Sequence, residues 1–163
     1  MASGFVFKGN TMEIDFMSKG EASKIIPDKN MALISVTDIG DRDVHIPFHK
    51  WENVTKLNFH DIDEKQEGMT LFNVQMARQI IKFVLGLPDN VNRIVVHCYA
   101  GISRSAAIVR FLQKFVYEGC FNPQFWISYN MYNRKVFSAL SQVWVDEFLY
   151  NLEAIKVVNK HKE

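Results

Sequence analysis

The sequence predicts an α/β domain in which helices flank a central, mostly parallel, twisted sheet. Strand-like and helix-like patterns alternate along the chain, and this alternation favours a layered α/β arrangement. The run Ile94–Val96 is wholly apolar, which is typical of a strand buried on both faces of a parallel sheet. The chain has 163 residues, of which 48% are hydrophobic and 13 are Phe, so we expect a well-filled core.

Residues 1–30 contain strand and helix patterns. Gly9 and Asn10 are turn residues between two apolar runs, so residues 5–16 predict a hairpin or a short strand pair. A short helix is predicted over Ser18–Ile26, where the helical pattern stops before Pro27. Further strands are predicted at Met31–Val36 and Val54–Phe59.

Most of the chain beyond residue 70 has a helical period. Apolar residues spaced four apart, from Phe72 to Val84, predict a helix over Thr70–Val84. Further helical segments are predicted at Ser103–Tyr117, ended by Gly119, and from Asn122 to about Val158 with breaks near Ser128–Asn133. We expect one domain over residues 1–163, with residues 155–163 as a frayed tail.

Charge and cysteine content narrow the classes of function. The formal net charge is +1, so nothing favours a nucleic-acid partner. Two cysteines are too few for a disulfide framework and suggest a reducing compartment, which we take to be the cytoplasm. We expect no signal peptide and no membrane partner, because no apolar run reaches the ~18 residues that a span requires.

The strand Ile94–Val96 runs through a histidine and a cysteine into a loop of small residues and then a helix. A helix N-terminus presents unpaired N–H groups and positive potential, which favour a bound anion. Gly101 and Ala100 keep the loop small enough for the backbone to approach a phosphate. We therefore predict an anion-binding loop with Cys98 at its base. The loop residues are His97, Tyr99, Ala100, Gly101, Ile102, Ser103 and Arg104.

The residue types in this loop point to nucleophilic chemistry. Cys98 reacts as a thiolate, and the helix N-terminus and Arg104 favour that form, so we expect a lowered pKa. The planar guanidinium of Arg104 can hold two phosphate oxygens at once. Ser105 is placed to hydrogen-bond the sulfur when it becomes the leaving group, and His97 is expected to orient the loop. A buried structural cysteine beside a solvated arginine is the alternative interpretation.

The string VVHCYAGISRSAAIV, residues 95–109, resembles the signature loop of cysteine-dependent protein tyrosine phosphatases, and specifically of their compact dual-specificity-like group. The resemblance extends from about Met31 to Leu149, but only the loop is highly specific. It implies a phosphotyrosine-phosphatase-like fold and a two-step reaction. The thiolate attacks phosphorus, and water then hydrolyses the cysteinyl-phosphate, with no metal or other cofactor.

The reaction implied by this resemblance needs a general acid on a loop that precedes the cysteine. The segment Leu57–Gly68 follows a strand pattern, precedes a helix and offers Asp61 and Asp63. We favour Asp61 because it comes directly after the strand-like residues. Asp63 remains the alternative, as does the interpretation that both are solvated loop carboxylates.

Three other groups of residues complete the expectations. Asn130–Leu140 resembles the segment that supports the signature loop in dual-specificity enzymes, with Asn133 as the supporting residue, although a helix N-cap explains Asn133 equally well. Cys120 is expected to be a semi-buried structural thiol, and a disulfide with Cys98 is the less favoured alternative. No metal-ligand spacing joins the remaining histidines, His45, His49, His60 and His161.

The variable loop positions indicate the substrate class, because none of them is charged. Related lipid phosphatases often carry lysines there, and relatives that act on RNA 5′-triphosphates have a different signature in a basic surround. The resemblance therefore implies a phosphorylated protein substrate that carries phosphotyrosine, with or without phosphoserine and phosphothreonine. A catalytically silent module that recognises a phosphorylated partner is the second hypothesis. Another enzyme with a Cys/Arg loop, such as an arsenate reductase or a sulfur transferase, is the third.

Overall fold

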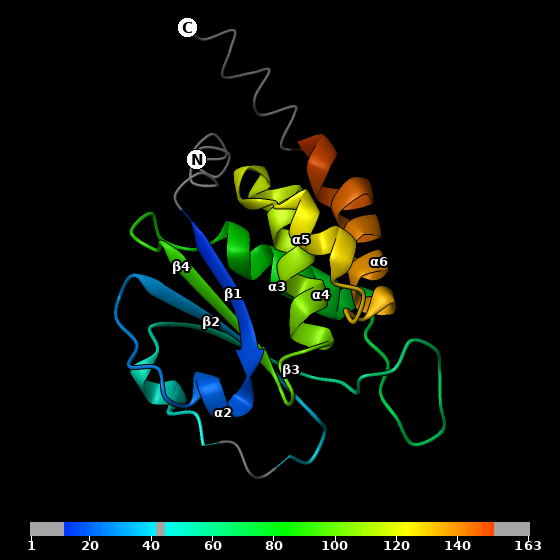
Figure 1. The fold of residues 1–163 in the computed structure, drawn as a ribbon, viewed down its shortest axis with the longest axis horizontal. Coiled ribbons are helices and arrows are strands. Elements are labelled where there is room, and N and C mark those ends of the chain that lie inside the picture. The colour runs from blue at the N-terminus through cyan, green and yellow to red at the C-terminus, as the bar shows by residue number, and fades with distance from the viewer. Residues whose placement is uncertain (1–11, 42–44, 152–163) are drawn as a thin grey trace, which may run out of the picture.

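A sheet of four parallel strands organises the residues that the computed structural model describes, 12–41 and 45–151 (Figure 1). The strands are β1 (Glu13–Ser18), β2 (Met31–Thr37), β3 (Asn53–Asn58) and β4 (Arg93–Cys98), in the spatial order β1-β4-β2-β3. Every neighbouring pair is parallel. The predicted α/β class is confirmed, and the three strands predicted at residues 31–36, 54–59 and 94–96 are present with slightly shifted ends.

Helices cover both faces of this sheet. The larger layer contains α3 (Val74–Leu85), α4 (Arg104–Phe111), α5 (Pro123–Ser128) and α6 (Arg134–Val143), which Figure 1 shows together on one side of the strands. Two of these helices continue as π-helical segments, α4 into η2 (Leu112–Val116) and α6 into η4 (Trp144–Leu149). Short elements complete the chain, namely α2 (Lys19–Ala22), η1 (Phe48–Lys50) and η3 (Glu118–Cys120). No helix among the described residues is both long and apolar enough to cross a membrane.

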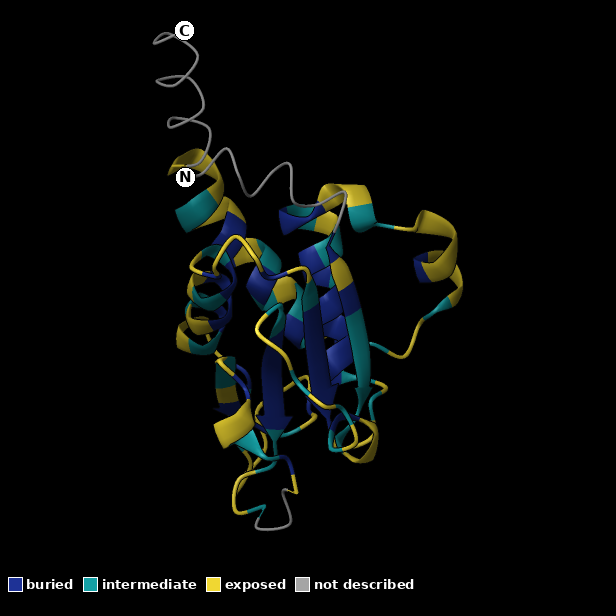
Figure 2. Cartoon of the chain, turned by 90° about the vertical axis from the view of Figure 1, so that its left-hand side faces the viewer, coloured by how far each residue is buried: buried dark blue, intermediate teal, exposed yellow. Residues whose placement is uncertain are grey.

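Alternation along the strands divides the core into two parts. Successive side chains of a strand point to opposite faces, so Ile34 and Val36 pack beneath the large helical layer while Leu33 packs on the other side. The two central strands are buried along most of their length (Figure 2). The same alternation sends Cys98 toward the helical layer and His97 to the opposite face, where it meets Ser35.

Local hydrogen bonds explain where two helices differ from their predicted spans. The helix predicted over Thr70–Val84 begins only at Val74, because the Asn73 side chain accepts a hydrogen bond from the Met76 N–H at 3.0 Å and caps it. The helix predicted over Ser18–Ile26 was too long. It is a single turn that ends at Ala22, since the backbone beyond it makes tighter, turn-type hydrogen bonds.

Two other predictions concern the N-terminal region and the helices after the signature loop. Residues 5–11 of the predicted hairpin and the predicted tail at residues 155–163 lie outside the described residues. The strand that follows, β1, pairs in parallel with β4. The helix predicted over Ser103–Tyr117 runs as α4 and η2, and the predicted break near Ser128–Asn133 separates α5 from α6.

The two cysteines lie at opposite ends of the sheet. Cys98 is in register with Ser18 at the end of β1, whereas the Cys120 thiol donates to the carbonyl of Met12, just before that strand begins. Six residues of extended chain span about 20 Å, and a disulfide needs Cα atoms within about 7 Å. No disulfide joins Cys98 and Cys120, so the alternative of a Cys98–Cys120 disulfide is wrong for this fold.

Candidate active site

The signature loop lies at the centre of the carboxyl edge of the sheet. β4 is flanked by β1 and β2, so its last residue, Cys98, emerges between two other strand ends. Ligands of parallel sheets bind at this edge. Ser103 precedes α4 without capping it, because its hydroxyl donates to Asp61 Oδ1 at 2.7 Å. The first N–H groups of α4 therefore have no cap from Ser103 and suit an anion in the loop.

Gly101 allows the loop to pack directly on the end of β1. Its φ is +72°, which L-residues with a side chain rarely adopt. A Cβ atom at this position would lie 2.2 Å from the backbone nitrogen of Ser18 and 2.3 Å from the carbonyl carbon of Met17. The Lys19 N–H also donates to the Tyr99 carbonyl at 3.3 Å. The curvature of the loop is thus fixed by the backbone at the end of β1 and by the first residue after it.

Cys98 has the surroundings of a thiolate. Its side chain is buried, and its sulfur lies 3.1 Å from the hydroxyl of Ser105. Burial alone would raise the pKa of Cys98, but the Ser105 hydroxyl, the N–H groups of Ser105 and Gly101 and the charge of Arg104 together lower it. The net direction matches the lowered pKa that the sequence predicts.

His97 is a neutral anchor beneath the loop. Its Nε2 atom is hydrogen-bonded to the Ser35 hydroxyl at 2.6 Å, and both side chains are buried between β4 and β2. Burial lowers the pKa of His97 from 6.5 to about 4, and the charges of Lys19 and Arg104 act in the same direction. The ring therefore ties the base of the loop to the neighbouring strand while it carries no charge near neutral pH.

The stability of the protein should fall as the pH drops below 6.5. Folded His97 resists protonation while the unfolded chain accepts the proton, so unfolding becomes more favourable with each pH unit down to about 4. The expected loss from this residue approaches roughly 3 kcal/mol near pH 4. Urea unfolding at neutral and acidic pH measures it, with His97→Asn as the comparison. If the wild type and His97→Asn lost the same free energy of unfolding at acidic pH, the loss could not be assigned to His97.

Arg104 is held in place by the ends of two strands. Its Nη1 atom donates to Asp38 Oδ1 at 2.7 Å and to the Phe59 carbonyl at 2.7 Å, and its side chain is 5% exposed. A solvated arginine, the alternative interpretation of the sequence, is therefore wrong. Asp38 follows β2 directly, and the sequence analysis did not single it out. An acidic residue immediately after a buried apolar strand, at the edge where the loop lies, is the signal that could have found it.

Asp61 is attached to both the signature loop and the start of α6. Its Oδ1 atom accepts from the Ser103 hydroxyl at 2.7 Å and from Asn133 Nδ2 at 2.8 Å. Asp61 and Asp63 line the same hollow, which has a volume of about 330 Å³. Among the described residues, neither Ser103 nor Asn133 donates a hydrogen bond to Asp63. The structure thus brings Asp61 to the loop, and both of these hydrogen bonds are accepted by Oδ1.

Asn133 combines the two roles that the sequence leaves open. Its Oδ1 atom accepts from the Val136 N–H at 3.0 Å and caps α6. Its backbone N–H donates to the Ser103 carbonyl at 3.0 Å, and its Nδ2 atom donates to Asp61 and to the Ile62 carbonyl. One residue therefore joins the helix, the signature loop and the aspartate loop.

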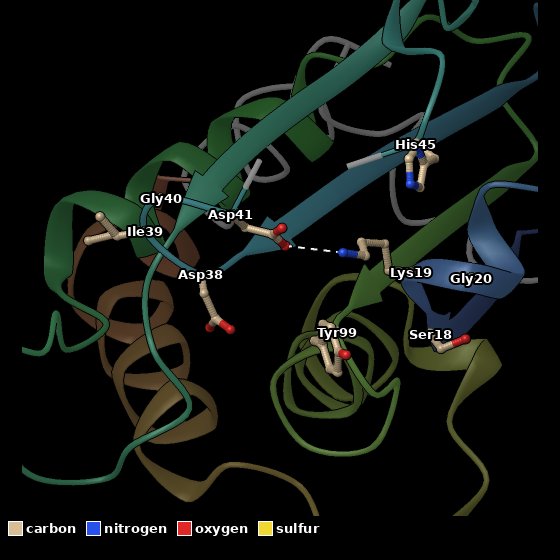
Figure 3. A pocket seen from close by; sticks show the side chains of 9 residues that line it. All are labelled: Ser18, Lys19, Gly20, Asp38, Ile39, Gly40, Asp41, His45 and Tyr99. Atoms are coloured by element: carbon tan, nitrogen blue, oxygen red, sulfur yellow. Dashed lines mark hydrogen bonds and ion pairs between the residues drawn. The ribbon is translucent and has the colours of Figure 1, made fainter. Parts of the chain in front are cut away.

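A larger cavity adjoins the loop between the residues at the ends of β1 and β2. Its volume is about 690 Å³, and Tyr99 and Asp38 form the wall nearest the signature loop. Figure 3 shows Lys19 reaching toward Asp41, which it meets at 3.3 Å. The Lys19 ammonium also lies 5.1 Å from the centre of the Tyr99 ring. The cavity therefore offers charged groups of both signs beside the anion site.

The remaining histidines have separate surroundings. His45 lines the large cavity, His49 lies in η1, and His60 Nδ1 accepts from the Thr70 N–H at 2.9 Å. His161 lies outside the described residues. Within the described ranges, no group of three His, Cys, Asp or Glu side chains is arranged to hold a metal ion.

The parallel sheet, with its Cys/Arg loop between the central strand and α4, is the fold of the protein tyrosine phosphatases and their dual-specificity relatives. A solved structure of PTPMT1 matches with a TM-score of 0.53 and 17% identity, over 89% of this chain and 94% of that chain. PTPMT1 in complex with PI(5)P matches with a TM-score of 0.50 and 16% identity, over 88% and 94%. These likenesses establish the fold. No family model matches the sequence, and no curated protein matches it.

Proposed function

We propose that this protein is a phosphomonoester hydrolase that acts through a cysteinyl-phosphate intermediate on phosphorylated protein side chains. The observation that carries the proposal is the buried Cys98 thiol with its lowered pKa, at the base of a loop that leads into Arg104. The thiolate, the guanidinium and the first N–H groups of α4 surround one position that suits a phosphate dianion. Phosphotyrosine is the principal substrate group, with phosphoserine and phosphothreonine as further ones.

The reaction proceeds in two displacements at phosphorus. The Cys98 thiolate attacks, and the bond between phosphorus and the leaving oxygen breaks while Asp61 protonates that oxygen. Arg104 and the loop N–H groups stabilise the oxygens of the transferring phosphoryl group. Water then attacks the cysteinyl-phosphate and gives a proton to Asp61, and Ser105 hydrogen-bonds the departing sulfur. Inorganic phosphate leaves, and Cys98 is again a thiolate.

The surroundings of the loop support a protein substrate in preference to a phosphoinositide. PTPMT1 has been solved with PI(5)P, and a phosphoinositide carries a phosphodiester anion besides its monoester. In this chain the positions between the cysteine and the arginine are uncharged. Among the described residues, each neighbouring hollow is lined by two aspartates and by a single lysine or arginine, so a second anionic group would find only one cationic side chain there. The aspartates are Asp38 and Asp41 on one side and Asp61 and Asp63 on the other.

Turnover of para-nitrophenyl phosphate by the purified protein tests the proposal. We expect hydrolysis that vanadate inhibits, and phosphate bound to Cys98 when the reaction is rapidly quenched in acid. Binding of vanadate without any turnover would instead support the phosphate-recognition module. Comparison of kcat/KM for a phosphotyrosine peptide and for PI(5)P in mixed micelles then separates a protein substrate from a lipid substrate.

The general acid is tested by the chemistry of the leaving group. Asp61→Asn should lower kcat/KM for phenyl phosphate by about 100-fold, because phenoxide needs a proton to depart. The loss for para-nitrophenyl phosphate should be much smaller, since nitrophenoxide is a better leaving group. Asp63→Asn is the matched control and should retain wild-type rates on both substrates. If only Asp63→Asn shows the selective loss, the assignment of Asp61 is wrong.

A further inference from the structure

Arg110 places a cation among aromatic rings in the helical layer. It lies on α4, six residues after Arg104. Its Cζ atom is 4.4 Å from the centre of the Tyr132 ring, 5.0 Å from that of Phe137 and 5.7 Å from that of Trp126. The rings come from α5, from the turn after it and from α6, so one guanidinium joins three segments that follow one another in the chain. These helices lie side by side in Figure 1.

The aromatic rings are the principal partners of this charge. Arg110 Nε is buried and has no hydrogen-bond partner among the described residues. Within the same residues no carboxylate lies within ion-pair distance of the Arg110 guanidinium. A partly buried cation without a carboxylate is costly unless other groups stabilise it, and aromatic ring faces do so through their quadrupoles. An apolar residue of similar size would fill the space without this attraction.

The rings around Arg110 lie next to the turn that contains Asn133, whose side chain donates a hydrogen bond to Asp61, the proposed general acid. We call residues Tyr129–Asn133 the supporting turn. The Tyr129 hydroxyl donates to the Ile102 carbonyl at 2.5 Å, and the Asn133 backbone N–H donates to the Ser103 carbonyl. Tyr132 precedes Asn133 directly, so the ring that lies nearest Arg110 belongs to the residue beside the one that holds Asp61.

We infer that Arg110 is a positioning residue for the general acid. By holding Tyr132, Arg110 fixes the supporting turn, and the turn fixes the amide that donates to Asp61 Oδ1. The inference rests on the proposed function, because it assigns Arg110 a part in protonating the leaving group. Arg110 itself touches neither the signature loop nor the substrate position, and it acts through Tyr132 and Asn133.

The test uses two substitutions of Arg110, and a double variant that combines one of them with Asp61→Asn. Each is assayed with two substrates that differ in their leaving group. Arg110→Met keeps the volume and removes the charge, whereas Arg110→Lys keeps a cation for the rings. We expect Arg110→Met to lower kcat/KM for phenyl phosphate about 10-fold and for para-nitrophenyl phosphate less than about 3-fold. Arg110→Lys should recover most of the phenyl phosphate activity. In an Asp61→Asn background, Arg110→Met should cause no further selective loss, because the group it positions is already gone.

Lys114→Met is the matched control. Lys114 is the next cation along the same side of this helical stretch, 5.8 Å from the centre of the Phe115 ring and 5.9 Å from that of Phe137, but not near Tyr132. Lys114→Met should leave kcat/KM unchanged for both phenyl phosphate and para-nitrophenyl phosphate. Melting temperatures of all variants separate a positioning effect from unfolding, and Arg110→Lys provides a milder change if Arg110→Met is poorly folded.

Each other outcome overturns a stated claim. Equal losses for both leaving groups, or the same loss in the Asp61→Asn background, would show that Arg110 has only a structural role. Wild-type leaving-group dependence in Arg110→Met would show that the charge contributes nothing to the acid. Absence of turnover by the wild type would overturn the proposed function and this inference together, whereas wild-type turnover with unaltered variants overturns this inference alone.

Discussion

Cys98→Ser should abolish hydrolysis while the protein still binds phosphate analogues. A serine hydroxyl has a far higher pKa than a thiol, so the hydrogen bonds and the charge that lower the pKa of Cys98 cannot make it an alkoxide. The expected loss of kcat is on the order of 10⁵-fold or more, as for other enzymes that lose their nucleophile. Turnover of para-nitrophenyl phosphate and calorimetric titration with tungstate measure the two effects separately.

The structure explains why binding should survive this substitution. Gly101 fixes the loop against the end of β1, and Asp38 and Phe59 hold Arg104, so none of these contacts depends on the sulfur. Serine is also slightly smaller than cysteine and fits the same buried position. A Cys98→Ser protein as active as the wild type would exclude the cysteinyl-phosphate mechanism. Loss of both activity and binding would show instead that the thiol is needed to maintain the loop.

Gly101→Ala should cost at least about 100-fold in kcat/KM, the second largest effect expected here. The new Cβ atom would lie 2.2 Å from the Ser18 nitrogen, where ordinary contacts are 3.4 Å or longer. The loop or the end of β1 must therefore move by more than 1 Å. Because both partners are backbone atoms, no side-chain rotation relieves the clash. The displaced loop would no longer direct its N–H groups and Arg104 at one phosphate.

Gly68→Ala separates the clash from the cost of the backbone conformation. Gly68 has a φ of +75°, close to the +72° of Gly101, but a Cβ atom there would meet nothing within 4 Å. Gly68→Ala should therefore lower the free energy of unfolding by only about 1–2 kcal/mol and leave kcat/KM unchanged. Denaturant unfolding and kinetics on both variants make the comparison. Similar effects on activity would mean that the close approach to β1 is unimportant.

The sequence revealed the parts of the site that are contiguous in the chain. The segment 97–105 combines a nucleophile, a glycine and an arginine at fixed spacing, and the strand before it and the helix after it could be predicted from local patterns. Asp61 could be predicted because it follows a strand at the same edge of the sheet. In each case the position of the side chain at the edge of the sheet follows from the strand and loop residues directly beside it in the sequence.

Contacts between segments far apart in the chain could not be predicted in this way. Arg104 and Asp38 are 66 residues apart, and their pairing depends on β2 lying directly beside β4. The sequence does not state that order of strands. Arg110 illustrates a second limit, because an arginine on a helix reads as a solvated residue until the rings of α5 and α6 are placed around it. The one-turn length of α2 is different in kind, because there hydrogen bonds between neighbouring residues, not distant contacts, ended the predicted helix early.

The pairing of Arg104 with Asp38 also affects how tightly a substrate binds. An arginine side chain loses rotamer entropy worth about 2 kcal/mol when it is immobilised. In this protein that entropy is lost when the chain folds, because Nη1 is already fixed by Asp38 and the Phe59 carbonyl before any phosphate arrives. An arriving phosphate therefore meets a preorganised guanidinium. Its affinity is higher by up to roughly 30-fold than it would be for a mobile side chain with the same contacts.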